Sequence, residues 1–353
     1  MSAFLVVVGI AGMFLLLIAP HEAGHFAFAK LFKVRVIEFS IGAGTRLWSM
    51  TREGTVYAIR ALPILGYVRM GGMEAGEFDD PSGFHRKPAW QRIVILIAGP
   101  AANFLVAMII VSCLEMTQLN SDPGKVFTVL PNTPAAAAGL QVGDSVRTVN
   151  GQPVTRIGQV KDAEAGAPGQ PLILTGVHAN GRAFNVTVTP VCSARTNCAI
   201  GIGMPRRLIY WHTALGDGAS FPFVAVGGIV GGLAQLITGQ VPGGLLGPNG
   251  VTGPIGIGEV AQQAVGLGLD TYLGFVALLS VALGFTNLLP LLALDGGRVV
   301  VVLIEVVRRR PFNRTVELNV QRFGLVALLA IAVYISALDI IRIASGQFPV
   351  LQR

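Results

Sequence analysis

Apolar residues in this chain gather into long uncharged runs instead of alternating with polar ones. The clearest runs cover residues 2–20, 93–114, 271–294 and 323–338. Each approaches or exceeds the ~20 residues that a helix needs to cross a ~30 Å hydrocarbon layer. The pattern therefore predicts a polytopic α-helical membrane protein with four transmembrane helices. No small-x-small cleavage site precedes His21, so we expect a permanent first span and not a removable signal peptide.

Composition supports a membrane protein and excludes other classes. The 353 residues are 52% hydrophobic and 13% charged, and the mean hydropathy is +0.64. These values exclude soluble, collagen-like, disordered and small disulfide-stapled proteins. The net charge of +7 comes from basic residues that bunch beside the apolar runs, so we expect contact with anionic lipid and no nucleic-acid partner.

The distribution of basic residues predicts the topology. Residues 30–92 hold ten Lys or Arg against six Asp or Glu, and residues 308–322 hold five basic residues against one acidic. Both segments should be cytoplasmic. A further run, 221–237, is uncharged but carries four glycines. A fifth span there would put 308–310 outside, so we interpret it as interfacial, with a spanning helix as the alternative.

Between the spans lie two segments with β-type patches. In the first loop the patches are residues 55–59 and 67–70, with a hairpin turn at Arg52-Glu53-Gly54. Residues 115–205 are more polar and carry short β-like runs broken by Gly, Pro and Asn, which predicts an inserted soluble domain. The predicted order is a first span at 1–30, a cytoplasmic β-hairpin loop at 31–92, a second span at 93–114, an extracytoplasmic domain at 115–205, an extracytoplasmic or interfacial segment at 206–270, a third span at 271–307, a cytoplasmic loop at 308–322 and a fourth span at 323–342.

The first span contains the sequence His21-Glu22-Ala23-Gly24-His25. On a helix the two histidines share one face, a spacing that suits two zinc ligands with the Glu as general base. A charged side chain in an apolar span costs on the order of 3 kcal/mol, so a functional role is the default interpretation of Glu22. The alternative is a set of polar groups that only pair with one another.

Asp295 is the best candidate for a third ligand. It is the one charged residue between Asp270 and Arg298, and Pro290 and Gly296-Gly297 flank it. Pro and paired Gly break the helix, which a membrane tolerates where protein or a wet cavity receives the freed backbone groups. An inward third span would deliver Asp295 to the depth of the two histidines. A helix cap or a salt bridge to Arg298 is the alternative.

These segments together resemble the site-2 proteases, and more narrowly the bacterial RseP-type branch with a PDZ domain between the second and third spans. The motifs follow the order of that family over nearly the whole chain: His21-Glu22-x-x-His25, Gly66–Gly72, Ala98–Phe104, Gly253–Ile257 and Asn287–Gly297. Two departures stand out. Leu291-Leu292 follow Pro290 where the family has a second Pro, and Pro63-Ile64-Leu65 precede Gly66 where it has Pro-x-Gly.

The resemblance implies an intramembrane zinc metalloprotease of the bacterial inner membrane. His21, His25 and Asp295 would bind Zn²⁺, and Glu22 would be the catalytic base. Asn103 and Asn287 would hold substrate or the oxyanion, although interhelical hydrogen bonding is an equal alternative for Asn103. Its substrates would be transmembrane helices, such as anti-sigma factors or signal-peptide remnants, already cut by an upstream site-1 protease.

The same resemblance assigns the loops. The hairpin around Gly66, Tyr67 and Val68 would dip towards the active site and pair with an unwound substrate, or else lie on the headgroups. The segment 139–151 resembles the core of a PDZ domain, which would filter substrates by size or bind peptide, or be purely structural. Cys192 and Cys198, in the oxidising compartment, are candidates for a disulfide. A membrane-anchored PDZ scaffold and a zinc transporter remain as functions of other classes.

Overall fold

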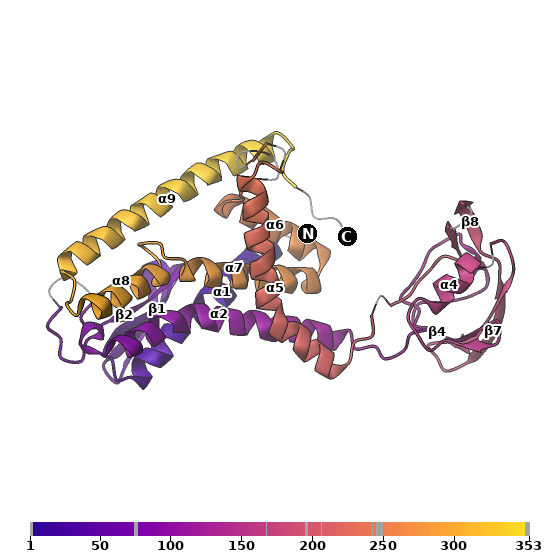
Figure 1. The fold of residues 1–353 in the computed structure, drawn as a ribbon, viewed down its shortest axis with the longest axis horizontal. Coiled ribbons are helices and arrows are strands. Elements are labelled where there is room, and N and C mark those ends of the chain that lie inside the picture. The colour runs from indigo at the N-terminus through magenta and orange to yellow at the C-terminus, as the bar shows by residue number, and fades with distance from the viewer. Residues whose placement is uncertain are drawn as a thin grey trace. The chain divides into compact units, whose positions relative to one another are not determined.

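The chain forms two compact units, each built around its own core (Figure 1). The computed structural model describes residues 3–73, 77–166, 168–194, 197–205, 207–241, 243–244, 247 and 250–349. Unit 1 consists of residues 1–114 and 217–353, and unit 2 of residues 115–216. Unit 2 is thus an insertion in the sequence of unit 1.

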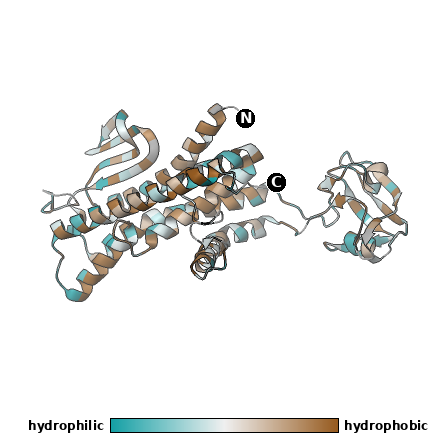
Figure 2. Cartoon of the chain, turned by 90° about the horizontal axis from the view of Figure 1, so that it is seen from above, coloured by the Kyte–Doolittle hydropathy of each residue, from teal (hydrophilic) through white to brown (hydrophobic). Residues whose placement is uncertain are grey.

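Helices of strongly apolar composition dominate unit 1 (Figure 2). In chain order they are α1 (Ala3–Leu31), α2 (Ala89–Thr117), α5 (Trp211–Ile237), α6 (Pro254–Leu267), α7 (Leu269–Leu288), α8 (Asp295–Arg308) and α9 (Arg314–Ala344). Within the described residues, α1, α2, α5, α7 and α9 are long and apolar enough to cross a membrane. This architecture fits a polytopic membrane protein.

Helix α5 covers the run that the sequence analysis interprets as interfacial. It begins ten residues before that run and is the fifth helix with the length and composition of a span. Length and composition are met equally by a spanning helix and by a helix lying along the interface, so the four-span arrangement stays a prediction. The segment 206–270 is in any case more helical than its Gly and Pro content indicates, because α6 follows α5 within it.

The predicted break in the third apolar run lies between α7 and α8. Leu289 leaves the helical conformation at the end of α7, and α8 begins at Asp295. The carbonyl groups at the end of α7 pack directly on the start of α8, where a Cβ on Gly296 or Gly297 would collide with the backbone oxygens of Leu288 and Leu291. The two glycines therefore allow α8 to start beside the end of α7.

The first loop folds into a long antiparallel hairpin of β1 (Val36–Arg52) and β2 (Thr55–Met70). Its turn consists of Glu53 and Gly54, both with positive φ, as the hairpin prediction requires. The strands bend, so that residues 38–41 of β1 have partners both at 56–59 and at 66–69 of β2. Residues 66–70 consequently form one border of this small sheet.

Buried polar contacts hold the two ends of α9. Near its start, Arg314 and Arg92 of α2 both donate to the carboxylate of Glu305 of α8, each over 2.7 Å. Near its end, the fully buried Asp339 accepts hydrogen bonds from the backbone N–H groups of Gly253 and Gly256, at the start of α6. Figure 1 shows α9 running from the end of α8 to α6.

Unit 2 is a small α/β domain. Its four-stranded sheet has the order β5-β4-β6-β7, with β4 at Ser145–Val149, β5 at Gln152–Pro153, β6 at Leu172–Val177 and β7 at Ala183–Val188. Two further antiparallel pairs join β3 (Thr128–Val129) to β10 (Ile202–Gly203) and β8 (Val191–Ala194) to β9 (Asn197–Ala199). The short helices are α3 (Pro134–Ala137) and α4 (Gln159–Gly166). Buried residues from both helices and from strands of the sheet, including Ala135, Val160, Leu172 and Leu174, form its core.

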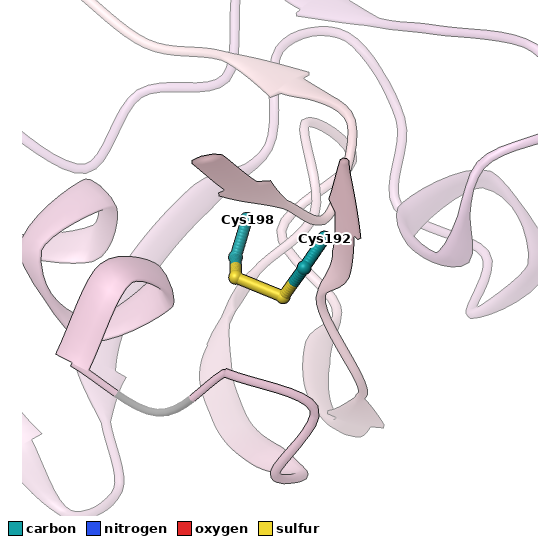
Figure 3. The surroundings of a disulfide bond; sticks show 2 residues. All are labelled: Cys192 and Cys198. Carbon is teal, nitrogen blue, oxygen red and sulfur yellow. A yellow bond between two sulfur atoms is a disulfide. The ribbon is translucent and has the colours of Figure 1, made fainter. Parts of the chain in front are cut away.

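A disulfide joins Cys192 of β8 to Cys198 of β9 (Figure 3). The two cysteines are direct partners across the hairpin, with Cα atoms 3.9 Å apart. Cys113 of α2 is a free cysteine. Both observations agree with the pairing that the sequence analysis proposes.

Candidate metal centre

Three side chains from α1 and α8 converge on one point inside unit 1. His21 and His25 lie on one face of α1, and their Nε2 atoms are 3.2 Å apart. The Oδ2 atom of Asp295 lies 3.3 Å from each of these nitrogens. Both histidines are buried, and the side chain of Asp295 is 16% exposed. Within the described residues, this is the group of side chains with the geometry to hold a metal ion.

The distances fit a tetrahedral zinc site. Zinc bonds to histidine nitrogen and carboxylate oxygen at ~2.0–2.2 Å, so two ligands at a tetrahedral angle stand about 3.3 to 3.5 Å apart. The three separations of 3.2 to 3.3 Å match that edge length. Two neutral imidazoles and one carboxylate are also the donor types that catalytic zinc sites use. Three protein ligands leave a fourth position free.

Helix α2 supports His25 from behind. The Nδ1 atom of His25 is 2.8 Å from the carbonyl oxygen of Ile95, so this nitrogen carries the proton and Nε2 presents its lone pair towards the ligand site. Gly99 lies against the ring, and a Cβ at that position would stand only 2.6 Å from Cε1 of His25. A glycine at residue 99 is what lets the imidazole fit between the two helices.

Glu22 lies beside the three ligands on the wall of a cavity. The hairpin comes close to α1 here, and Val68 of β2 lies on the wall of the same cavity. Gly66 makes the close approach feasible, because a Cβ there would come within 3.0 Å of Cγ of Glu22 and 2.8 Å of Ile18. The border of the sheet and the acidic side chain are therefore in direct contact.

The cavity has a volume of about 740 Å³ and joins the ligand site to the hairpin. Its walls are mostly apolar side chains of α1 and α7, with single contributions from α2 and α6. The polar or hairpin residues of its lining are His21, Glu22, His25, Leu65, Gly66, Tyr67, Val68, Met70, Thr286, Asn287, Asp295 and Arg298. An extended peptide segment can enter a space of this size and lie along residues 65–68.

A polar network fixes Tyr67 at the side of this cavity. Arg60 donates to the hydroxyl group of Tyr67 over 2.7 Å and to the Glu38 carboxylate over 2.8 Å. It also donates to Ser40, which is fully buried. Burial alone would raise the pKa of Glu38, but its hydrogen bonds to Arg60 and Tyr67 hold that pKa below its usual range. The carboxylate therefore stays ionised and holds the two segments of the hairpin together.

The two asparagines occupy different environments. Asn287 lines the cavity, and its Nδ2 donates to the carbonyl oxygen of Leu283 over 3.1 Å. Asn103 is fully buried between helices and does not belong to the cavity lining. Of the two expected substrate contacts, only Asn287 is thus in reach of a molecule in the cavity.

Several residues of the site escape sequence reasoning. The carbonyl of Ile95 and the space at Gly99 act through backbone atoms, which carry no side-chain signal. Gly66 and Gly99 stand within the motifs Gly66–Gly72 and Ala98–Phe104, but the sequence does not tell which atoms they touch. Asp295 could be predicted as a ligand because a carboxylate in an apolar run is rare.

The site has the composition of a mononuclear metallohydrolase centre, in which two histidines and a carboxylate surround one point and a glutamate stands beside it. Comparison with known proteins agrees. Peptidase family M50 matches residues 9–331. The chain therefore belongs to peptidase family M50, the site-2 proteases, and is a membrane-embedded metallopeptidase whose metal is zinc.

Curated relatives match over their whole length. A Clostridium perfringens protein whose name includes the words zinc metalloprotease is 33% identical, over 95% of this chain and 96% of its own. The zinc metalloprotease RasP of Geobacillus kaustophilus is 28% identical, over 91% of this chain and 94% of its own. The regulator of sigma-W protease RasP of Bacillus subtilis is 26% identical, over 97% and 98%.

Proposed function

We propose that this chain is an intramembrane endopeptidase that hydrolyses peptide bonds within transmembrane segments of single-pass membrane proteins after a first protease has cut their ectodomains. The observation that carries this proposal is the triangle of His21, His25 and Asp295, with Glu22 beside it, inside apolar helices. Anti-sigma factors and signal-peptide remnants are the proposed substrates. The name of the sigma-W-regulating relative from Bacillus subtilis supports the first of these.

Each residue has a proposed task. His21, His25 and Asp295 hold Zn²⁺, which when bound supplies a Lewis acid and lowers the pKa of water. Glu22 accepts the proton of the attacking water at its carboxylate and delivers it to the departing amine. Asn287 lines the cavity, and the second hydrogen of its Nδ2, the one not donated to Leu283, can bind the substrate carbonyl or the oxyanion.

Substrate capture follows from the hairpin. A transmembrane helix hides its amide groups in internal hydrogen bonds, so it must unwind before a peptide bond can be attacked. The border at residues 66–70 offers backbone groups to which an extended strand can add. Because Val68 and Glu22 line the same cavity, a strand added there would lie next to the general base.

Topology completes the proposal. The hairpin and residues 308–322 face the cytoplasm, α5 lies along the interface, and four helices cross the bacterial inner membrane. Unit 2 is an extracytoplasmic PDZ-like domain that excludes substrates with bulky ectodomains. A non-proteolytic PDZ scaffold has less support, because a structural zinc site needs no Glu22 on a cavity wall.

The test is Glu22→Gln. A carboxamide cannot accept the proton, so we expect cleavage of a tethered transmembrane test substrate to fall by at least about 100-fold while the bound zinc stays stoichiometric. His25→Ala is the comparison variant and should lose both zinc and cleavage. Undiminished cleavage by the Glu22→Gln protein would refute the assignment of the base.

A further inference from the structure

Two buried polar groups near the centre of unit 1 are left without partners in the part of the chain that the structure describes. The carboxamide of Asn103 is fully buried, and neither its Oδ1 nor its Nδ2 has a hydrogen-bond partner. The Nδ1 atom of His21 is also buried and unpartnered. Buried polar groups of this kind are rare in folded proteins and call for an explanation.

His21 differs in this respect from the other histidine of the site. Histidines that bind a metal through one nitrogen almost always give the other ring N–H to an acceptor, which fixes the tautomer and the orientation of the ring. His25 meets this rule through the carbonyl oxygen of Ile95. The equivalent partner of His21 has to come from an element packed beside it.

Asn103 is the residue of α2 that corresponds to His21 when positions are counted from the contact between His25 and Gly99. At one level His25 faces Gly99, and at another Met13 and Leu17 pack in the same cluster as Ile110. The two helices therefore run antiparallel. Residues 25, 17 and 13 succeed one another along α1 in the direction in which α2 runs from residue 99 to residue 110. One turn from each member of the His25–Gly99 pair lie residues 21 and 103.

We propose that Asn103 is a positioning residue for the metal ligand His21. Its Oδ1 accepts the Nδ1–H of His21, directly after rotation of the amide or across one ordered water. The Nε2 lone pair of His21 is thereby directed towards Asp295 and His25. This inference rests on the proposed metal site and adds to it a partner for the second imidazole.

Two other roles for Asn103 explain less. A substrate contact needs an opening to the cavity, and Asn103 does not line it. A role in joining α2 to α7 would need a hydrogen bond from the side-chain amide of Asn103. The bond observed at this contact runs instead from the Ser280 hydroxyl to the backbone oxygen of Asn103. The contact with α7 uses neither polar atom of the amide, so the Asn103 side chain can accept a hydrogen bond from α1.

The experiment measures zinc affinity by chelator competition in the full-length protein. Asn103→Leu keeps the volume but removes the acceptor, so zinc affinity should fall by about 10- to 100-fold. Asn103→Asp keeps an acceptor oxygen and should stay within about threefold of the natural protein. Ser280→Ala is the matched control, because it perturbs the same contact between α2 and α7 without touching the amide, and it should leave affinity unchanged.

Two further readouts separate positioning from packing. Thermal unfolding of the zinc-free Asn103→Leu protein should be unchanged or shifted upwards, since the variant removes a buried unpartnered amide. The visible spectrum of the Co²⁺-substituted protein should change in Asn103→Leu and not in Ser280→Ala, because it reports ligand orientation. If Asn103→Leu does not fold, Asn103→Ala replaces it in both measurements.

Unchanged zinc affinity in Asn103→Leu, or an equal loss in Asn103→Asp, would overturn the inference. Neither result depends on turnover, whereas the Glu22→Gln test of the proposed function does. A failed test of Asn103 would therefore leave the assignment of the protease intact. A failed test of Glu22 as the base would likewise leave the role of Asn103 intact.

Discussion

Gly99 is a residue whose role is purely to leave space. Gly99→Ala would place a methyl group into the ring of His25, whose Nδ1 is held by the Ile95 carbonyl one turn earlier on the same helix. We expect the imidazole to shift and zinc affinity to fall by at least about tenfold. Chelator competition measures the loss.

Gly274→Ala provides the control for this change. Gly274 lies in α7, and among the described residues no side chain comes within 4 Å of the place that a new methyl group would take. Alanine there should leave zinc binding intact. An equal effect of the two substitutions would show that the change in helix propensity, and not the loss of space beside His25, causes the fall in zinc affinity.

His85 makes the stability of the segment between β2 and α2 depend on pH. Burial, together with the nearby Arg314 and Arg92, lowers the pKa of His85 to about 3. The folded protein therefore keeps this ring neutral, while the unfolded chain takes up a proton below pH ~6.5. The stability that a neutral ring contributes is present above pH ~6.5 and is lost as the pH falls towards about 3.

The expected loss from this residue is about 1 to 2 kcal/mol between about pH 7 and pH 5. His85→Gln removes the titration, so its melting temperature should fall less over that interval than that of the natural protein. Scanning calorimetry in detergent at both pH values measures the difference. Parallel falls in the two proteins would contradict the assignment to His85.

At the scale of single residues, the sequence marks side chains and not their partners. His21, Glu22, His25 and Asp295 were predicted as site residues because ionisable groups in apolar runs are costly. Asp339 and Arg342 satisfy the same criterion at the end of the last run, but the predicted span was centred on its apolar part. The partners of Asp339 are backbone N–H groups of a distant segment, which the sequence does not mark.

Among the helices, α6 and α9 depend on one buried carboxylate. Asp339 accepts from the N–H groups of Gly253 and Gly256, and Arg342 donates to the carbonyl of Val251. The first turn of α6 would otherwise carry orphan donors in a buried position. Since Ile257 of α6 also lines the cavity, the contact bears on the shape of the site.

Asp339→Leu should therefore destabilise unit 1 by about 3 kcal/mol, because it leaves the α6 donors and the Arg342 charge without their carboxylate. Asp339→Asn keeps one acceptor oxygen and should lose less. The double variant with Arg342→Leu removes both charges and should recover part of the loss. Thermal unfolding in detergent ranks the three, and a milder effect of Asp339→Leu than of Asp339→Asn would contradict this account.

The elements were predicted unevenly for a physical reason. Long apolar runs are read directly from composition, and each of α1, α2, α7 and α9 contains most of one run. The bounds differ most at the end of α1, at residue 31, and at the start of α9, at residue 314. The ends of α7 and α9, at residues 288 and 344, each differ from their runs by six residues. Helices α5 and α6 contain or follow many glycines, so their formation depends on packing that the local sequence does not encode. The bend that gives residues 38–41 two sets of partners is likewise a tertiary feature.

For the whole molecule, the way unit 2 is joined to the chain makes it separable. Its two ends meet in an antiparallel pair, in which the backbone groups of Asn120 and Ile209 exchange hydrogen bonds of 2.9 and 2.8 Å. Ends this close can be connected by a short linker without stretching either flanking helix.

Replacement of residues 121–208 by a short Gly/Ser linker should thus leave zinc stoichiometry and the cleavage of short-ectodomain substrates within about threefold of the natural values. If unit 2 excludes large ectodomains, the same variant should cleave uncut substrates that the natural protein rejects. A cleavage assay on a series of ectodomain sizes measures both. Loss of zinc from the variant would contradict the separability of the two units.

The distribution of the three proposed ligands along the chain has a consequence for biogenesis. His21 and His25 both lie in α1, whereas Asp295 follows His25 by 270 residues and therefore leaves the ribosome much later. A nascent or truncated polypeptide consequently holds an incomplete ligand set. A polypeptide that stops before residue 295 should therefore bind zinc more weakly than one that includes the carboxylate of Asp295.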